Sequence, residues 1–377
     1  MTDNPVCLWR PIHRSFGAAR ATPVSFACYA NNEAKALDAI GKLTRILECA
    51  HMTPNGLRVS ILMPMRNAAA FVEDALRSVL AETNVPLEVI VVDDGSTDSS
   101  RTLVDCLTDP RIRVMDGPCL GIAAAYNTAL AAARGDIVMR CDADDLYPVQ
   151  RIALQVGWLD RHSEFGAVCG SFSAIDRRGG NELQFSTSAQ ATEITNELFA
   201  GITRTHFCSF AVRTNILRNL GGMRSYFQTG EDIDLQLRIG EICRVWYSPE
   251  VAYRYRIHNS SITHMRRAKE NLYFEGLARH FQVQRKVRGV DDLSLGRAPE
   301  VPSFHGAQRQ SGKAHMQNLL IGSTWEAADR GDYRLALRYA IEAAMSRPNS
   351  LSGWRNLLAA LVKFGLSAVG SKRPKDG

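Results

Sequence analysis

Between residues 58 and 145, short apolar runs alternate with stretches of helical periodicity, and this alternation limits the fold more than any other feature. The run LEVIVVDD (87–94) is apolar up to its two aspartates, as in strands that are buried on both faces of a sheet. The segments between such runs carry apolar residues at helical spacing, as at Phe71, Ala75 and Val79. Strands that alternate with helices predict a parallel sheet with helices on both faces.

The same patterns set the expected elements and domain boundaries. We expect strands over 58–64, 87–94, 111–116, 136–142 and 165–172, and helices over 68–82, 98–107, 121–135, after Pro148, near 230–239, over 264–285 and three times within 312–367. Gly- and Pro-containing residues 288–308 indicate a linker. The predicted organisation is an extension over 1–57, an α/β domain over 58–262, a basic helix and linker over 263–310, and a helical region over 311–377.

The N-terminal extension has its own pattern. Residues 31–50 predict an amphipathic helix, and the patterned domain begins only near Leu57. Met52 lies just before that point, so one interpretation takes Met52 as the start and the first 51 residues as dispensable. The first 16 residues lack the apolar stretch of a signal peptide, and no run of about 18 residues is free of charge.

Composition narrows the class of partner and compartment. The chain has 377 residues, is 45% hydrophobic and carries a formal net charge of +6. That excess suits an anionic partner such as a nucleotide or a lipid surface, and it is too small to indicate nucleic acid. Nine cysteines without a C-x-x-C pair or zinc spacing indicate reduced thiols. We therefore expect a cytoplasmic protein without a transmembrane helix.

Three polar clusters directly follow three expected strands: PMRN (64–67), DDGSTD (93–98) and DADD (142–145). In an open parallel sheet, ligands bind beyond the carboxyl ends of the strands, so these clusters should meet at one crevice. Clustered carboxylates repel one another unless a cation lies between them. Mg²⁺ and Mn²⁺ prefer oxygen ligands and commonly bridge carboxylates to substrate phosphates. The pattern predicts a metal that holds a diphosphate.

Simpler interpretations exist for each acidic segment. The DADD aspartates would also suit a solvated turn that caps the helix after Pro148, although one aspartate suffices for a cap. In DDGSTD, we expect Gly95 to form the turn, Asp98 to act mainly as a cap, and the two leading aspartates to face the ligand. Thr229 and Asp232 have the spacing of a capping box.

The segment YRYRIHNSSIT (253–263) leaves further alternatives open. Arg254 and Arg256 alternate along an apparent strand, so they share a face and would meet either phosphate or solvent. His258 lies among these arginines, and an isolated histidine is more often structural than a ligand.

In combination the motifs resemble the family 2 glycosyltransferases, the inverting group with the GT-A fold. The resemblance covers residues 58–262 and is carried, in the family's order, by VSILMPMRNAAAFVEDALRSVL, LEVIVVDDGSTDSS, GIAAAYNTALAAARGDIVMRCDADD, GEDIDLQLRI and YRIHNSS. It implies a GT-A-type, doubly wound and mostly parallel sheet with flanking helices, followed here by a C-terminal helical extension. The sequence departs from the family's usual residues at Arg66, often aromatic, at Gln236, often tryptophan, and at Cys141, usually apolar.

The resemblance also implies roles for individual residues. The nucleotide would be bound by Pro64, Met65, Arg66, Asn67, Asp93, Asp94, Asp142 and Asp144. The metal, Mn²⁺ or Mg²⁺, would be bound by Asp144, Asp145 and His258. The catalytic pair would be Glu231 and Asp232, with Asp232 as the general base.

This resemblance implies a reaction and its partners. A sugar would pass from a nucleotide-diphosphate donor, by default a UDP-sugar, to a glycan or lipid-linked acceptor in surface-polysaccharide or glycolipid synthesis. The metal would stabilise the leaving diphosphate while Asp232 takes a proton from the attacking hydroxyl. Two alternatives stay open. A metal-dependent nucleotidyltransferase would have a glycine-rich first loop, which PMRNAAAF lacks, and a degenerate, binding-only relative would have no physical reason to keep every acidic residue.

The C-terminal residues have two interpretations as well. Residues 331–348 resemble one tetratricopeptide unit, and a single copy does not make a repeat array. In LSGWRNLLAALVKFGL (351–366), an apolar stripe would pack on the preceding helices or lie on a membrane, with Lys372, Arg373 and Lys375 close behind. The second interpretation predicts a peripheral contact with the inner face of the membrane.

Overall fold

The computed structural model describes residues 58–180, 182–185, 190–258, 268–304, 311–329 and 331–370. The chain divides into two units, Met1–His51 and Met52–Gly377. The first unit, and with it the helix expected within residues 31–50, lies outside the described residues. All elements below belong to the second unit.

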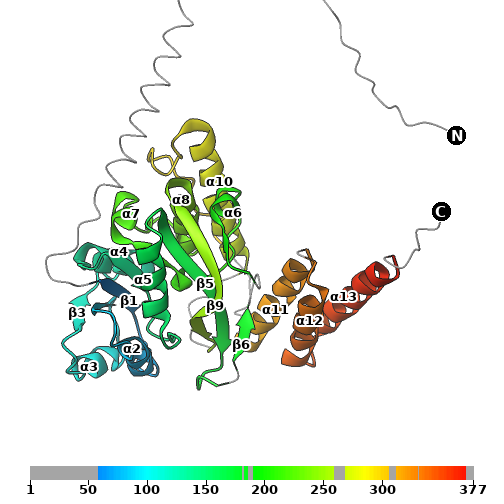
Figure 1. Ribbon diagram of the computed structural model, residues 1–377, viewed down its shortest axis with the longest axis horizontal. Helices are drawn as coiled ribbons and strands as arrows, with labels where there is room; N and C mark the ends of the chain where they lie inside the picture. Colours follow the sequence, from blue (N-terminus) through cyan, green and yellow to red (C-terminus); the bar gives the residue numbers. More distant parts are fainter. Residues whose placement is uncertain are drawn as a thin grey trace, which may run out of the picture. The chain divides into compact units, whose positions relative to one another are not determined.

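One sheet of nine strands organises the described residues (Figure 1). Its strands are β1 (Val59–Met65), β2 (Leu87–Asp93), β3 (Ile112–Asp116), β4 (Ile137–Arg140), β5 (Phe165–Ile175), β6 (Leu183–Phe185), β7 (Thr192–Glu193), β8 (Ala211–Arg213) and β9 (Arg244–Arg256). They are ordered β3-β2-β1-β4-β8-β5-β9-β7, with β6 paired to β5. The first four strands are parallel, as predicted. The α/β class is confirmed, and the sheet is mixed because β8 is antiparallel to both its neighbours.

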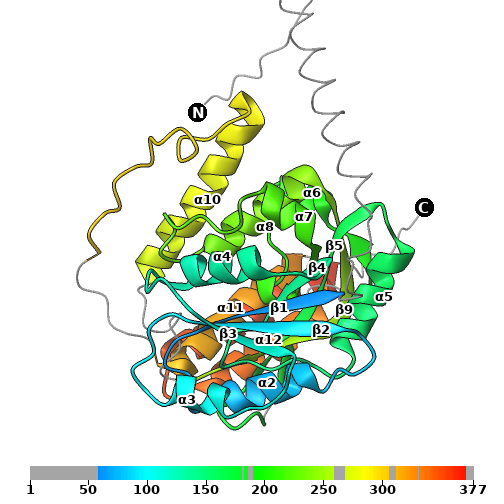
Figure 2. The same ribbon diagram turned by 90° about the vertical axis from the view of Figure 1, so that its left-hand side faces the viewer.

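Helices cover both faces of this sheet. They are α2 (Val72–Leu80), α3 (Ser100–Asp105), α4 (Ile122–Ala132), α5 (Arg151–Arg161), α6 (Thr195–Phe199), α7 (Thr214–Asn219), α8 (Glu231–Ile242) and the 3₁₀ turn η1 (Phe207–Ser209). Ile61 and Met63 of β1 pack in the core with α2 and α5, whereas Leu62 packs in the core that contains Tyr126 of α4. Figure 2 shows α4 and α2 on opposite sides of the strands. This alternation is the period-two pattern of a strand buried on both faces.

A buried polar contact fixes the chain between α4 and β4. The hydroxyl of Ser60 donates to Glu88 at 2.7 Å, and the backbone N–H of Gly135 donates to Ser60 at 2.9 Å. A Cβ atom at Gly135 would lie 2.6 Å from the backbone nitrogen of Ser60. Only glycine fits this close approach. The helix expected up to Gly135 ends earlier, at Ala132, because the backbone is already extended at Ala133.

The predicted linker is partly structural. Helix α10 (Ala268–Arg288) follows the gap after residue 258 and packs on α8, with Phe274 and Phe281 in one core with Phe227. Beyond α10, Asp291 is fully buried and pairs with Arg224 at 2.6 Å and with Arg285. The residues around Asp291 therefore pack against the domain instead of forming a free connection.

Three helices follow, as expected: α11 (Gly312–Asp329), α12 (Tyr333–Ser346) and α13 (Leu351–Gly370). They contact the sheet through Tyr339, whose ring stacks on Phe185 with centroids 5.9 Å apart and whose hydroxyl donates to the carbonyl of Gln184. In the part of the chain that the structure describes, every helix is too short or too polar to cross a bilayer.

Candidate active site

The loop after β1 is tied to the loop after β2 by Asn67. This residue adopts a left-handed conformation with φ 52°, which asparagine tolerates better than most residues. Its side-chain oxygen accepts the backbone N–H of Thr97 at 2.7 Å, and its own N–H donates to Ser96. Arg66 and Asn67 are exposed, whereas Pro64 and Met65 are buried within β1. Two of the four PMRN residues expected to bind nucleotide therefore present side chains at the surface.

The two aspartates after β2 differ in their surroundings. Asp93 accepts the backbone N–H of Ser96, which shapes the turn at Gly95, where φ is 81°. Asp94 is buried, and its Oδ2 accepts the N–H of Gly121 at 2.8 Å. Its Oδ1 is also buried and has no hydrogen-bond donor among the described residues. A buried carboxylate oxygen without a donor is costly, so this oxygen is a candidate contact for a ligand.

Asp98 was expected to act as a cap, and its carboxylate accepts hydrogen bonds near the start of α3. Its carboxylate accepts the backbone N–H of Ser100 at 2.9 Å and of Ala69 at 3.2 Å. These bonds, with help from the Ser100 hydroxyl, lower the pKa of Asp98 against the opposing effect of burial. The N-cap residue of α3 is Ser99, without a side-chain cap bond, so Asp98 ties the loop after β1 to the start of α3 instead of forming the cap itself.

The aspartates after β4 do not cap α5, because the residue at the N-cap is Gln150 and no side chain bonds there. Asp145 is buried and faces the sheet. It accepts the hydroxyl of Tyr253 at 2.6 Å and the backbone N–H of Arg256 at 2.7 Å. Burial and the charges of Asp144 and Asp142 raise the pKa of Asp145 well above its usual range. Both oxygens are occupied by β9, an arrangement that suits an anchor better than a metal ligand.

Asp142 is bound by a buried arginine. Arg140 donates to Asp142 through Nε at 2.7 Å and Nη2 at 3.1 Å, and its Nη1 lies 3.9 Å from Glu231. Burial opposes the charge of Arg140, but the carboxylates of Asp142 and Glu231 raise its pKa above the usual value. This arginine joins the end of β4 to the start of α8.

The start of α8 lacks the expected capping box. Its N-cap is Gly230, in the left-handed region with φ 75°, and no side chain bonds to the helix end there. Thr229 and Asp232 therefore do not cap each other. Asp232 is half-buried, and its Oδ1 accepts only the N–H of the next residue, Ile233, among the bonds that the structure describes. Burial and the charge of Asp232 raise the pKa of Glu231 to about 7, while Arg140 acts in the opposite direction.

Asp144 and His258 meet in space although 114 positions separate them. His258 Nε2 lies 3.0 Å from Asp144 Oδ2, and the imidazole packs on Phe71 with ring centroids 4.4 Å apart. The side chain of Asp144 is 31% exposed, so this carboxylate remains open to a ligand. Within the described ranges, no three His, Cys, Asp or Glu side chains group as a complete metal site.

Arg256 lies inside the fold instead of facing solvent. It is buried, and its guanidinium donates to the carbonyls of Asp144 and Arg177, both at 2.8 Å. Arg254 pairs with Glu182 at 3.1 Å near the surface. The expected contact with solvent is wrong for Arg256, because its buried side chain holds the DADD turn against β9.

One residue near the site was missed altogether. His206 is half-buried, and its ring packs between Phe172 and Tyr255, with centroids 5.0 and 5.4 Å away. Burial lowers the pKa of His206 against the opposing charges of Asp232 and Asp142. The surrounding sequence RTHFCSF carried no motif that would have identified it.

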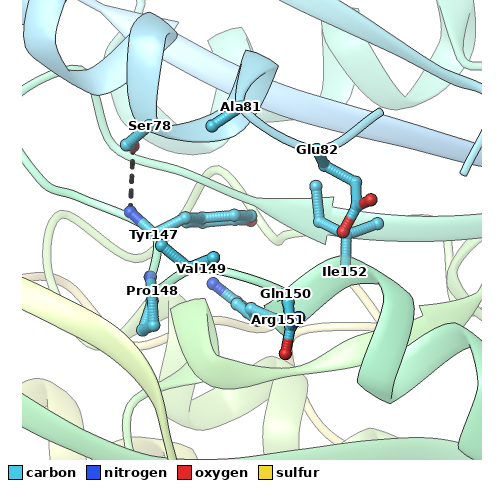
Figure 3. A pocket seen from close by; sticks show the side chains of 9 residues that line it. All are labelled: Ser78, Ala81, Glu82, Tyr147, Pro148, Val149, Gln150, Arg151 and Ile152. Carbon is cyan, nitrogen blue, oxygen red and sulfur yellow. Dashed lines mark hydrogen bonds between the residues drawn. The ribbon is translucent and has the colours of Figure 1, made fainter. Parts of the chain in front are cut away.

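A small pocket lies away from these residues, between the end of α2 and the start of α5 (Figure 3). Ser78, Tyr147 and Ile152 contribute to its lining, and the N–H of Tyr147 donates to the Ser78 hydroxyl at 3.0 Å. None of the predicted site residues lines it. We therefore assign no function to this pocket.

Comparison with known proteins gives the same family as the motifs. Residues 60–228 match the family model described as glycosyl transferase family 2. Chondroitin synthase of Pasteurella multocida (strain Pm70) is 27% identical over 223 residues, which are 56% of this chain and 22% of that protein. The putative glycosyltransferase EpsE of Bacillus subtilis (strain 168) is 29% identical over 195 residues, 50% of this chain and 68% of that protein.

Solved structures were compared as well. The crystal structure of S. aureus TarS 1-349 in complex with UDP-GlcNAc aligns with 82% of this chain and 80% of that chain, at 15% identity and a TM-score of 0.48. Among the curated relatives, the chain spans only about a fifth of the length of the Pasteurella multocida chondroitin and hyaluronan synthases, 22% of each.

Proposed function

We propose that this chain, which carries a family 2 glycosyltransferase domain over residues 60–228, transfers a sugar from a nucleotide-diphosphate donor to an acceptor hydroxyl. The observation that carries the proposal is the meeting of Asp144 and His258 beside the Arg140–Asp142 pair. The proposed donor is a UDP-sugar, and the acceptor is a glycan or a lipid-linked glycan in surface-polysaccharide synthesis.

The pair Asp144 and His258 fits a divalent cation. One exposed carboxylate and one imidazole 3.0 Å away supply two ligands, and diphosphate oxygens and water would supply the others. The imidazole favours Mn²⁺ over Mg²⁺, because Mg²⁺ is bound by oxygen ligands almost exclusively. When bound, such a cation stabilises the charge that develops on the leaving diphosphate. Asp145 supports this pair indirectly, since it holds the backbone of Arg256 just before His258.

Asp232 is the proposed general base. The acceptor oxygen would attack the anomeric carbon as the bond to the diphosphate breaks, and the hydroxyl proton would pass to Asp232. A single displacement of this kind inverts the anomeric centre. The N-terminus of α8 stabilises a negative charge at this position. Arg140 bridges Asp142 and Glu231, and so holds the proposed nucleotide side of the site next to the proposed base.

The first experiment measures binding of UDP, GDP and dTDP by calorimetry with and without Mn²⁺. We expect one nucleotide to bind the wild-type chain, and to bind it only in the presence of Mn²⁺. In Asp144→Asn, we expect most of this affinity to be lost and the remaining affinity to be independent of Mn²⁺. The matched control is Asp160→Asn, which removes an ion pair with Arg58. Arg58 directly precedes β1, so this pair lies at the amino ends of the strands, away from the proposed site.

Three outcomes would count against the proposal. Metal-independent binding, or no binding of any nucleotide, would contradict the metal-bridged donor. Retained activity in Asp232→Asn, measured as release of free nucleotide diphosphate from the donor, would remove the assigned base. A wild-type protein that binds nucleotide but never releases product would be a binding protein instead of a transferase.

A further inference from the structure

Helix α13 is held to its neighbours by one face. Gly353, Asn356 and Ala360 are buried, and Asn356 donates to the hydroxyl of Thr324 on α11 at 3.2 Å. A Cβ atom at Gly353 would lie 2.6 Å from the carbonyl oxygen of Ala343 on α12, so the two helices are in close contact there. Phe364 adds ring contacts to Trp325 of α11 and Tyr333 of α12, and together these residues pack α13 (red in Figure 1) on both helices.

The opposite face of α13 is apolar and exposed. Its large side chains are between 44% and 69% exposed, and they are Leu351, Trp354, Leu358, Leu361 and Val362. We call these five residues the α13 stripe. Their spacing places them on one side of a helix, opposite the buried face. A contiguous exposed apolar surface of this kind marks an interaction site in a soluble protein.

The indole of Trp354 is suited to an apolar phase. Its Nε1–H donates to the carbonyl oxygen of Pro348 at 2.8 Å, within the same chain. The ring can therefore leave water without exposing an unpaired donor, which would otherwise cost free energy. Tryptophan is enriched at the boundary between water and lipid for related reasons.

Charge distinguishes a lipid partner from a second copy of the chain. Residues 343–375 contain no Asp or Glu, and their basic residues are Arg347, Arg355, Lys363, Lys372, Arg373 and Lys375. Lys363 lies 3.7 Å from Asp329 of α11, whereas Arg355 is exposed beside the α13 stripe. Two copies paired through this face would bring like charges together, whereas an anionic surface would neutralise them.

We propose that the α13 stripe lies on the surface of a bilayer that contains anionic lipids. The apolar side chains would enter the boundary between headgroups and acyl chains, and the exposed Arg347 and Arg355 would contact lipid phosphates. No described helix can span a bilayer, so the contact is peripheral. The proposal does not rest on transferase activity, because the same surface would bind lipid in an inactive protein.

The test is co-flotation of the full chain with phosphatidylcholine vesicles, with and without about 30% phosphatidylglycerol. We expect binding to the anionic vesicles, several-fold weaker binding at high salt, and little binding to neutral vesicles. Leu358→Asn/Leu361→Asn should weaken binding at least tenfold, since each side chain loses its transfer from water. Ala359→Asn adds the same polar group at an exposed neighbouring position outside the stripe, and should bind within about twofold of wild type.

Three results would overturn the proposal. The first is a wild-type chain that floats with neither vesicle. The second is a double variant that binds like Ala359→Asn. The third is a wild-type dimer by light scattering that becomes monomeric in the double variant without vesicle binding, because the stripe would then contact a second copy. Unchanged circular dichroism and melting temperature in both variants keep these results interpretable.

Discussion

Two acid-rich regions of this protein include residues of α8 and differ in how their charge is offset. In one, Asp234, Glu241 and Asp291 pair with three arginines: Arg224, Arg238 and Arg285. In the other, a single arginine, Arg140, pairs with Asp142 and Glu231, and three further carboxyl groups, Asp144, Asp145 and Asp232, have no arginine side chain as a described partner. We call the first region the arginine network and the second the acidic site.

Two carboxyl groups of the acidic site have pKa values raised towards the protonated form. The pKa of Asp145 is raised by burial and by two neighbouring carboxylates, and that of Glu231 is raised to about 7 by burial and by Asp232. The acidic site thus holds more carboxyl groups than its one arginine can pair with. Clustered acids alone do not mark a functional site, since the arginine network has them too; carboxyl groups with perturbed pKa values are more typical of one.

The largest expected effect is on the acidic site. Asp232→Asn should reduce the rate of sugar transfer by about a thousandfold, within the range for loss of a general base. The variant should stay folded and keep its nucleotide affinity, because Asp232 has no ion pair within the described residues. Donor turnover, nucleotide calorimetry and urea unfolding measure the three quantities. A variant that lost stability as much as activity would place Asp232 in the framework instead.

Substitution in the arginine network should lower stability, in contrast to Asp232→Asn, which should lower activity. Asp234→Ala leaves Arg224 and Arg238 without their shared buried partner, and this should cost about 3–5 kcal/mol of unfolding free energy. The control is Asp105→Ala, which breaks an exposed pair with Arg101 and should cost under about 1 kcal/mol. Urea unfolding compares the two variants. Equal losses would show that burial does not distinguish these pairs.

The sequence predicted the location of the acidic site because strand periodicity is a local property. The three polar clusters follow β1, β2 and β4, and parallel strands bring their carboxyl ends to one edge. The sequence could not predict which carboxylates face the crevice. Asp144 and Asp145 are adjacent, yet one meets His258 and the other enters the sheet towards Tyr253.

Other expectations from the sequence were wrong because the sequence pattern does not show which contacts a side chain makes. The capping box at Thr229 fits the letters of the sequence, but a left-handed Gly230 begins α8 without a side-chain cap. Arg256 looked like a surface or phosphate-binding residue, and only the packing of β9 against the DADD turn shows where its guanidinium is bound. The expected linker contains Asp291, and one of its partners, Arg224, lies 67 positions away. Contacts between residues far apart in sequence leave no local pattern.

Asp145→Asn sharpens the distinction between an anchor and a metal ligand. An amide cannot accept from both Tyr253 and the N–H of Arg256, so the variant should lose about 1–3 kcal/mol of unfolding free energy. Its affinity for Mn²⁺ in the presence of nucleotide should fall less than that of Asp144→Asn. Calorimetry and urea unfolding measure both quantities. A greater loss of metal affinity in Asp145→Asn would return Asp145 to the metal ligands.

The smallest effect concerns the protonation of Glu231. Its folded pKa of about 7 lies above the ordinary value of 4.5, so the folded state holds this proton more tightly. The contribution of Glu231 to stability is therefore greatest below pH 4.5 and is lost as the pH rises to 7. An ionised Glu231 also adds negative charge where the acceptor proton is taken up, so turnover should rise severalfold between pH 6 and 8. Glu231→Gln should flatten both profiles. A rise in turnover that persists in this variant would assign the titration to another group.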